Sequence, residues 1–160
     1  MARQPITREA YDKLAAEIKH MEEVEMAEIG KRIAEARAEG DLSENAEYHG
    51  QKDNQGRLQE KINRKKAILS TCEIVEKGDI RTDKVAFGTV VTVEDEEYGD
   101  EEAYELVGPG EEDYEAEPVK ILTSSPVGQA LLGKAVGEVA VADTPNGEAR
   151  FKVLKIEAAG

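Results

Sequence analysis

The 160 residues of this chain carry a formal net charge of −14; 35% of them are charged, 4% are aromatic and none is Trp. This composition disfavours one large globular core and favours one or two small domains, partly elongated. It also excludes binding to nucleic acid through the charge of the whole chain, because phosphates repel an acidic protein. No apolar run reaches the roughly 18 residues of a membrane-spanning helix. Because Cys72 is the only cysteine, we expect a cytoplasmic protein in a reducing compartment.

Two long segments with helical periodicity occupy the first half of the chain. Apolar residues of the first recur every three or four positions in a narrow seam with one polar member: Tyr11, Leu14, Ile18, Met21, Glu25, Ile29, Ile33 and Ala36. The second segment carries a matching seam: Tyr48, Gln51, Gln55, Leu58, Ile62, Lys65, Leu69 and Cys72. Such narrow seams are typical of two-stranded coiled coils. With Thr7 as N-cap of the first helix, Gly78 as C-cap of the second and a short turn at Gly40, the pattern predicts an antiparallel helical hairpin.

The turn of this hairpin contains two carboxylates, Asp41 and Glu44. At the start of a helix, Asp-x-x-Glu is a capping box whose side chains satisfy backbone N–H groups. Capping does not explain why a long thin arm is built, however. The same two acids could complete a metal site in a partner's active centre, since Mg²⁺ accepts one or two protein carboxylates and keeps water or phosphate oxygens in its other positions. Alone, the two acids would hold such an ion weakly.

Charge differs between the two helices. Residues 22–39 are mainly acidic, whereas basic residues dominate 52–66: Lys52, Arg57, Lys61, Arg64, Lys65 and Lys66. Charge pairing between the helices, which would fix their register, is a sufficient explanation. Alternatively Lys52 and Arg57, which lie nearer the tip, face a phosphate chain.

The second half of the chain has a different composition and predicts an α+β unit. We expect strands over 85–93, 103–107, 119–122, 138–143 and 149–156, the last two joined by a turn at Asn146-Gly147. Residues 124–133 predict a short helix with Ser before it, Pro in its first turn and Gly after its end. Residues 94–117 hold 13 acids and no Lys or Arg, which indicates a solvated surface, because the ligand spacing of a calcium loop is absent. The predicted domains are therefore 1–78, with an acidic tip at 40–49, and 79–160.

The tip segment Gly40-Asp41-Leu42-Ser43-Glu44-Asn45-Ala46-Glu47-Tyr48-His49 resembles that of the Gre family of bacterial transcript cleavage factors. The resemblance continues in Gln55-Gly56, in Ser125-Pro126-Val127-Gly128-Gln129-Ala130-Leu131-Leu132-Gly133-Lys134 and in Val136-Gly137-Glu138. It implies a coiled-coil hairpin followed by a small FKBP-like antiparallel β-sheet domain with one short helix. This second domain would dock on bacterial RNA polymerase. The docking residues that the resemblance implies are Ser125, Pro126, Gly128, Leu131, Leu132 and Gly133.

The resemblance also implies a transcription elongation factor that is not an enzyme itself. Its arm would enter the secondary channel of bacterial RNA polymerase when the enzyme has backtracked. Asp41 and Glu44, with Ser43 as an auxiliary residue, would help hold the second Mg²⁺ of the polymerase and position the attacking water, so that the metal is bound only in the complex. Lys52 and Arg57 would contact the extruded 3′ segment of the nascent RNA.

We expect a monomer that has no sequence-specific DNA binding and meets DNA only indirectly, through the polymerase. Two other functions stay open on the sequence alone. One is a channel-binding regulator that does not stimulate cleavage, which the retained Asp41 and Glu44 disfavour. The other is a generic coiled-coil adaptor.

Overall fold

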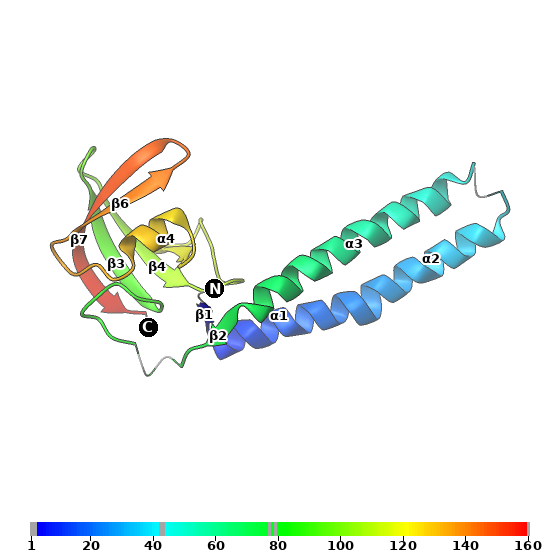
Figure 1. Cartoon of the computed structure of the whole chain (residues 1–160), viewed down its shortest axis with the longest axis horizontal. Coiled ribbons are helices and arrows are strands. Elements are labelled where there is room, and N and C mark those ends of the chain that lie inside the picture. The colour runs from blue at the N-terminus through cyan, green and yellow to red at the C-terminus, as the bar shows by residue number, and fades with distance from the viewer. Residues whose placement is uncertain (1–2, 42–43, 77, 79, 160) are drawn as a thin grey trace. The chain divides into compact units, whose positions relative to one another are not determined.

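A computed structural model of the chain describes residues 3–41, 44–76, 78 and 80–159. These residues form two compact units, Tyr11–Thr71 and Met1–Ala10 with Cys72–Gly160. The first unit is a helical hairpin, and the second contains a five-stranded sheet with one short helix (Figure 1). The predicted fold class is confirmed. Residues 1–10 and 72–78, which the sequence assigned to the hairpin domain, belong to the sheet-containing unit.

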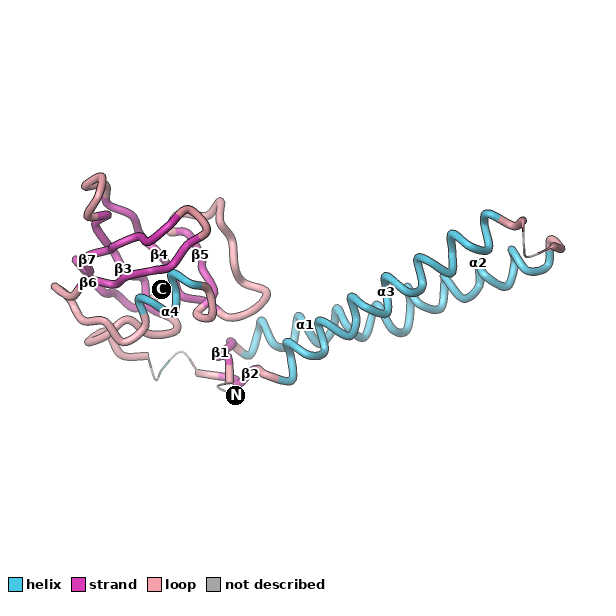
Figure 2. Tube along the Cα trace, turned by 45° about the horizontal axis from the view of Figure 1, so that its top comes forward, coloured by secondary structure: helices cyan, strands magenta, loops and turns pink. Residues whose placement is uncertain are grey.

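The hairpin consists of two antiparallel arms that lie side by side (Figures 1 and 2). The first arm contains α1 (Arg8–His20), the π-helical segment η1 (Met21–Glu25) and α2 (Met26–Ala38), and the second is α3 (Ala46–Ser70). Thr7 caps α1 as predicted, because its Oγ1 accepts a hydrogen bond from Ala10 N at 3.1 Å. The predicted C-cap at Gly78 is wrong, since α3 ends eight residues earlier. None of the described helices combines the length and the apolar character needed to cross a membrane.

An apolar core joins the two arms in the half of the hairpin away from the tip. Leu14, Ile18, Met21, Leu58 and Ile62 are buried there, and Met26, Ile29 and Leu69 pack partly buried against them. Toward the tip, Ile33 and Ala36 of the first arm are buried, while α3 contributes the half-buried Gln51 and Gln55. The base of the hairpin is therefore better packed with apolar side chains than the tip half.

The π turn of η1 corrects the phase of the apolar seam. Met26 N–H bonds to the carbonyl of Met21, five residues back, so one extra residue is accommodated. On an uninterrupted α-helix, Met21 and Ile33 would lie about 120° apart around the axis, because each residue turns the helix by about 100°. Because the π turn takes up one extra residue, the rotation from Met21 to Ile33 is that of a regular helix one residue shorter, and the two side chains lie only about 20° apart. The sequence placed Glu25 on the seam; in the structure Met26 packs against the core and Glu25 turns to His20.

A two-stranded parallel sheet pairs the start of the chain with the segment after α3. β1 (Gln4–Ile6) pairs with β2 (Cys72–Ile74), with Ile6 opposite Ile74. Cys72 is buried as predicted, but it lies in a strand and not on the helical seam. Ile6 is fully buried, and a Cβ placed on Gly108 would lie 2.3 Å from the carbonyl oxygen of Pro5. β1 therefore packs directly against the backbone at Gly108.

The main sheet has the strand order β5-β4-β3-β7-β6. Its strands are β3 (Thr89–Asp95), β4 (Glu101–Val107), β5 (Val119–Leu122), β6 (Val139–Thr144) and β7 (Gly147–Ala158). All neighbours pair antiparallel except β4 and β5, which are parallel. The sheet is thus mixed, where the sequence predicted an antiparallel one. The β6–β7 hairpin turns at Pro145-Asn146, and Gly147 follows with φ +108°, in agreement with the predicted Asn-Gly turn.

Helix α4 (Pro126–Leu131) packs on one face of this sheet (Figure 1). Ser125 Oγ caps it by accepting from Gly128 N at 3.1 Å, and Pro126 occupies the first turn, both as predicted. Leu131 is fully buried in a core with strand residues that include Val91, Val93 and Leu106. This core fixes the short helix to the sheet.

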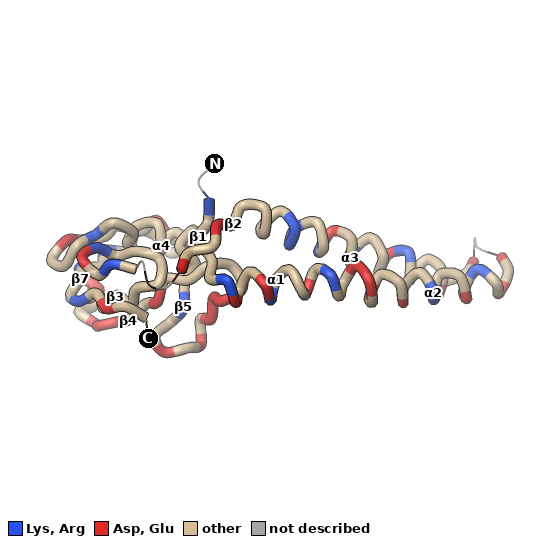
Figure 3. The backbone as a smooth tube through the Cα atoms, turned by 90° about the horizontal axis from the view of Figure 1, so that it is seen from below, with Lys and Arg blue, Asp and Glu red and all other residues tan. Residues whose placement is uncertain are grey.

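The acidic stretch 94–117 contains the end of β3, the turn after it, all of β4 and the loop after β4. Red segments gather in this part of Figure 3. None of the 13 acids of the stretch is buried, which confirms the predicted solvated surface. Tyr104, a residue of β4, lies within this stretch, and the pKa of its hydroxyl differs from the ordinary value. Burial, together with its hydrogen bond to Glu102, raises the pKa of the Tyr104 hydroxyl, so the hydroxyl stays protonated and donates.

Gly56 lies inside α3 with no heavy atom within 4 Å of the position of a Cβ, so no close helix approach requires it. We expect Gly56→Ala to raise the free energy of unfolding by about 1 kcal/mol, because Ala favours the helix. Gly128→Ala should lower it by about 1–3 kcal/mol through overlap with neighbouring backbone, since its Cβ would lie 2.2 Å from Leu122 O. Calorimetric unfolding measures both changes; a loss of stability in Gly56→Ala would contradict the open space seen around it.

Gln51 marks a weak point of the tip half. Its Nε2 donates to Glu47 Oε1 at 3.0 Å, but its Oε1 is buried and has no hydrogen-bond partner among the described residues. We expect Gln51→Leu to raise the free energy of unfolding by about 1 kcal/mol, because an unsatisfied buried acceptor is removed and apolar contact is added. Calorimetry again measures the shift. The same change at the exposed Gln59 should alter stability by less than about 0.5 kcal/mol, and equal effects at both sites would refute the explanation.

Candidate functional site at the hairpin tip

The tip is the loop of residues 39–45 between α2 and α3. Gly40 has φ +116°, a left-handed value that lets the chain leave α2 as predicted. Asp41 and Glu44 follow it, and both are exposed. Ser43, the predicted auxiliary residue, lies outside the described residues. The two predicted site acids are therefore on a solvated loop at the far end of both arms.

Asn45, and not Asp41, caps helix α3. Its Oδ1 accepts a hydrogen bond from Tyr48 N at 3.0 Å, and the helix begins at Ala46. The predicted capping box of Asp41 and Glu44 is thus wrong, although Asn and Asp are equally good caps. Both acids precede the N-cap. With the described residues Glu44 makes no hydrogen bond or ion pair.

Two contacts bring the last turn of α2 against the start of α3. Asn45 Nδ2 donates to the carbonyl of Ala36 at 2.6 Å, across the loop. The guanidinium of Arg37 lies 6.0 Å from the centroid of the Tyr48 ring, a cation–π distance. The Tyr48 ring also meets His49 edge-on, with centroids 5.3 Å apart. The two ends of the acidic loop are therefore tied to each other through side chains.

Four acidic residues lie in the tip loop or next to it in the chain, and all are exposed: Glu39, Asp41, Glu44 and Glu47. Within the described ranges, no three His, Cys, Asp or Glu side chains are grouped so that they could hold a metal ion. Carboxylate oxygens are the donors that Mg²⁺ prefers, and one or two of them leave most of its coordination to other ligands. The donor set fits an ion shared with a partner better than one held by this chain alone.

The two interpretations of the basic residues apply to different parts of α3. Near the base, Lys65 pairs with Glu17 at 3.2 Å and Lys66 with Glu22 at 2.8 Å, so the predicted charge pairing between arms is confirmed there. The ion pairs found among the described residues include neither Lys52 nor Arg57, and both are exposed. Figure 3 shows both signs of charge along the arms. The basic side chains nearer the tip are thus presented to solvent.

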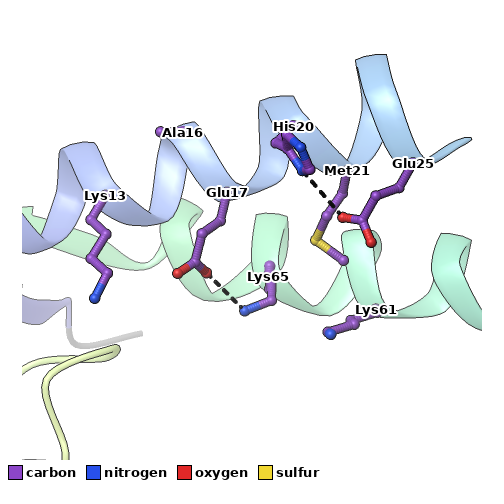
Figure 4. A pocket seen from close by; sticks show the side chains of 8 residues that line it. All are labelled: Lys13, Ala16, Glu17, His20, Met21, Glu25, Lys61 and Lys65. Atoms are coloured by element: carbon purple, nitrogen blue, oxygen red, sulfur yellow. Dashed lines mark hydrogen bonds and ion pairs between the residues drawn. The ribbon is translucent and has the colours of Figure 1, made fainter. Parts of the chain in front are cut away.

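A shallow recess of about 580 Å³ lies beside η1, between α1 and α3 (Figure 4). Its lining residues are Lys13, Ala16, Glu17, His20, Met21, Glu25, Lys61 and Lys65. Both of its carboxylates have partners: Glu17 pairs with Lys65, and Glu25 lies 3.5 Å from His20 Nδ1. Exposed pairs of this kind contribute about 0–1 kcal/mol each. Glu17 and Lys65 join the two arms and help to set their register, whereas His20 and Glu25 both belong to the first arm.

The predicted docking residues around α4 have unequal access to a partner. Leu131 is fully buried and Gly128 is enclosed by Leu122 and Ser125, so these two shape the fold and cannot form the docking surface. Pro126 and Gly133 are exposed, and Ser125 and Leu132 are half-buried. The Ser, Pro and Gly of this motif indicated a short helix but did not reveal which of its residues face the sheet.

Comparison with known proteins gives matches along nearly the whole chain. Residues 4–74 match the family described as transcription elongation factor, N-terminal, and residues 80–158 match transcription elongation factor, GreA/GreB, C-term. The transcription elongation factor GreA of Verminephrobacter eiseniae is 40% identical over 153 residues, 95% of this chain and 96% of that protein. GreA of Thermoanaerobacter pseudethanolicus is 39% identical over 94% of this chain and 95% of that protein. The crystal structure of GreA factor homolog 1 (Gfh1) from Thermus thermophilus is 29% identical, covers 98% of this chain and 99% of its own, and gives a TM-score of 0.45.

Proposed function

Because this chain belongs to the GreA/GreB family of transcription elongation factors, which act on RNA polymerase, we propose that it reactivates backtracked polymerase by stimulating cleavage of the nascent RNA. The hairpin enters the secondary channel and carries its tip to the active centre. One observation supports this proposal above all: Asp41 and Glu44 are exposed on a loop at the end of two packed helices. The 25 residues of α3 give this arm a reach of about 37 Å.

The chain contributes carboxylates to an active site that belongs to the polymerase. In a two-metal site, Mg²⁺ ions stabilise the attacking and leaving oxygens of an in-line displacement at phosphorus. Asp41 and Glu44 would supply ligands to the second ion, which is otherwise weakly held. An ionised carboxylate at this place can also accept a hydrogen bond from the attacking water and so orient it. On this proposal the protein is a cofactor of polymerase and not an enzyme, and Ser43 would add a hydroxyl to the same site.

Lys52 and Arg57 would contact the 3′ segment of RNA that backtracking extrudes. Lys52 lies six residues into α3, about 9 Å along the helix from its first residue. Both side chains are exposed and take no part in the ion pairs of the described residues. Phosphates bind such cations through Coulomb attraction and counterion release. A local basic patch can do this in an acidic protein when the polymerase holds the two together.

The sheet domain would hold the factor on the polymerase, with Pro126, Gly133, Ser125 and Leu132 as the accessible residues of the proposed docking surface. We further propose that the protein acts as a cytoplasmic monomer and meets DNA only through the polymerase. The alternative is a protein that binds in the channel and regulates the polymerase without stimulating RNA cleavage. Measurement of RNA cleavage in backtracked complexes distinguishes the two.

Asp41→Asn combined with Glu44→Gln should lower the rate of RNA cleavage in backtracked complexes by about 100-fold or more, because both metal ligands lose their charge. Cleavage of end-labelled RNA at saturating factor measures this rate, and competition for polymerase should show unchanged binding. Glu39→Gln with Glu47→Gln is the matched control, since it removes two charges from the same tip. A wild-type factor that binds polymerase without speeding cleavage would support the regulator instead.

Lys52→Glu should weaken the contact between the hairpin and the extruded RNA, because a phosphate chain repels the new carboxylate. Crosslinking from the RNA 3′ segment to the factor should drop by about tenfold, and the loss should shrink as salt rises. Arg64→Glu reverses a charge on the same helix about 18 Å farther from the tip and should leave crosslinking unchanged. Equal losses in both variants would show a general charge effect and no local RNA contact.

A further inference from the structure

We propose that Asn45 is the positioning residue of the tip: its amide ties together the two ends of the loop that carries Asp41 and Glu44 and thereby sets where these carboxylates lie. This inference rests on the proposed cleavage function, because it assigns a role within the same site. Asn45 itself touches neither RNA nor metal in this proposal. It acts through the two acids.

The geometry that supports this role is a pair of opposed hydrogen bonds from one side chain. Oδ1 accepts from Tyr48 N at 3.0 Å and so fixes the start of α3, while Nδ2 donates to Ala36 O at 2.6 Å and so fixes the end of α2. The segment of residues 37–44, which holds the last two residues of α2 and the loop as far as Glu44, lies between these two anchor points in the chain. Its ends cannot separate or slide past each other without breaking one of the two bonds.

The chemistry requires an amide at this position. A single short side chain must accept from one helix and donate to the other, and only Asn combines a carbonyl oxygen and an NH₂ group at this length. Asp and Ser are equally suitable N-caps, but Asp cannot donate, and Ser is a shorter side chain with one hydroxyl. Capping alone therefore does not account for Asn at position 45.

The acceptor is itself well placed for a strong constraint. Ala36 is 2% exposed, so little water can replace the amide donor. The Ala36 carbonyl also accepts from Glu39 N at 3.2 Å, and Gly40 N donates to the neighbouring Arg37 O. The first residues of the loop are therefore bonded to the carbonyls at the end of α2, and Asn45 binds one of these two carbonyls. Arg37 over the Tyr48 ring adds a second, weaker connection between the same two turns.

Small displacements of catalytic groups have large consequences. A misplacement of about 1 Å can cost roughly 100-fold in rate, and loss of a group that orients a metal ligand typically costs about 10–100-fold. A loop of this length with unfixed ends would let Asp41 and Glu44 sample many positions. Tying its ends restricts that freedom before the arm meets its partner, which lowers the cost of ordering the loop there.

Asn45→Asp tests the donor separately from the cap, because it keeps the oxygen that accepts from Tyr48 N and removes the NH₂ group. At saturating factor we expect the rate of RNA cleavage to fall by about 10–100-fold, with the concentration for half-maximal binding to polymerase unchanged. Asn45→Ser, which also caps but adds no charge, should show a similar loss. Hydrogen exchange at the Tyr48 amide should stay slow in both variants and become fast in Asn45→Ala.

Asn63→Asp is the matched control, since it makes the same chemical change on α3 and keeps the oxygen that accepts from Gln59 Nε2 at 3.0 Å. It should cleave at the wild-type rate. A loss in Asn45→Asp with a normal rate in Asn45→Ser would assign the effect to the added charge and overturn the role of the donor.

A double-mutant cycle then shows whether Asn45 acts through the acids. In a Glu44→Gln background, Asn45→Asp should lower the rate by less than about twofold further, because residues that act as one unit are not additive. Full additivity would overturn the inference while the proposed function stands. Intact cleavage in Asp41→Asn with Glu44→Gln would overturn the proposed function itself, and normal cleavage in Asn45→Asp alone would overturn only the positioning role.

Discussion

The hairpin depends on one narrow apolar seam between its arms. An isolated helix of this kind is marginal in water, so each arm needs the other for its stability. Leu14, Ile18 and Met21 of the first arm meet Leu58 and Ile62 of α3 in the apolar core of the hairpin. Toward the tip α3 presents Gln51 and Gln55, and polar contacts hold the arms together there. This division suits an arm that must be firm at its base and must carry a solvated, charged loop at its end.

Features that depend on local chemistry could be predicted from the sequence. Alternation and turn residues located the strands, and Ser125-Pro126 located the start of α4. The errors concern contacts between distant segments. Cys72 continued the helical spacing, but pairing with β1, nearly 70 residues earlier, draws it into a strand. The parallel pairing of β4 with β5 likewise leaves no mark in either strand's own sequence.

The candidate site was predictable in its acids but not in its construction. Asp41 and Glu44 stand out because they occupy the turn of a hairpin and match a family motif. Their supposed capping role was wrong because Asn45 competes for the same helix start and also reaches Ala36, a contact that depends on how the arms pack. The π turn could have been found. The apolar spacing from Met21 to Ile33 drifts too far around a regular helix to form one seam.

That π turn determines the direction in which the tip faces. Every residue after Glu25 is rotated about the axis of the first arm by about 100° relative to an uninterrupted α-helix. The end of α2, from which the acidic loop departs, shares this rotation. The bearing of Asp41 around the arm is therefore set at the π turn, about 20 Å before the end of α2. Along such an arm, one residue more or less would change its length by only about 1.5 Å and yet turn the acids by about 100° around its axis.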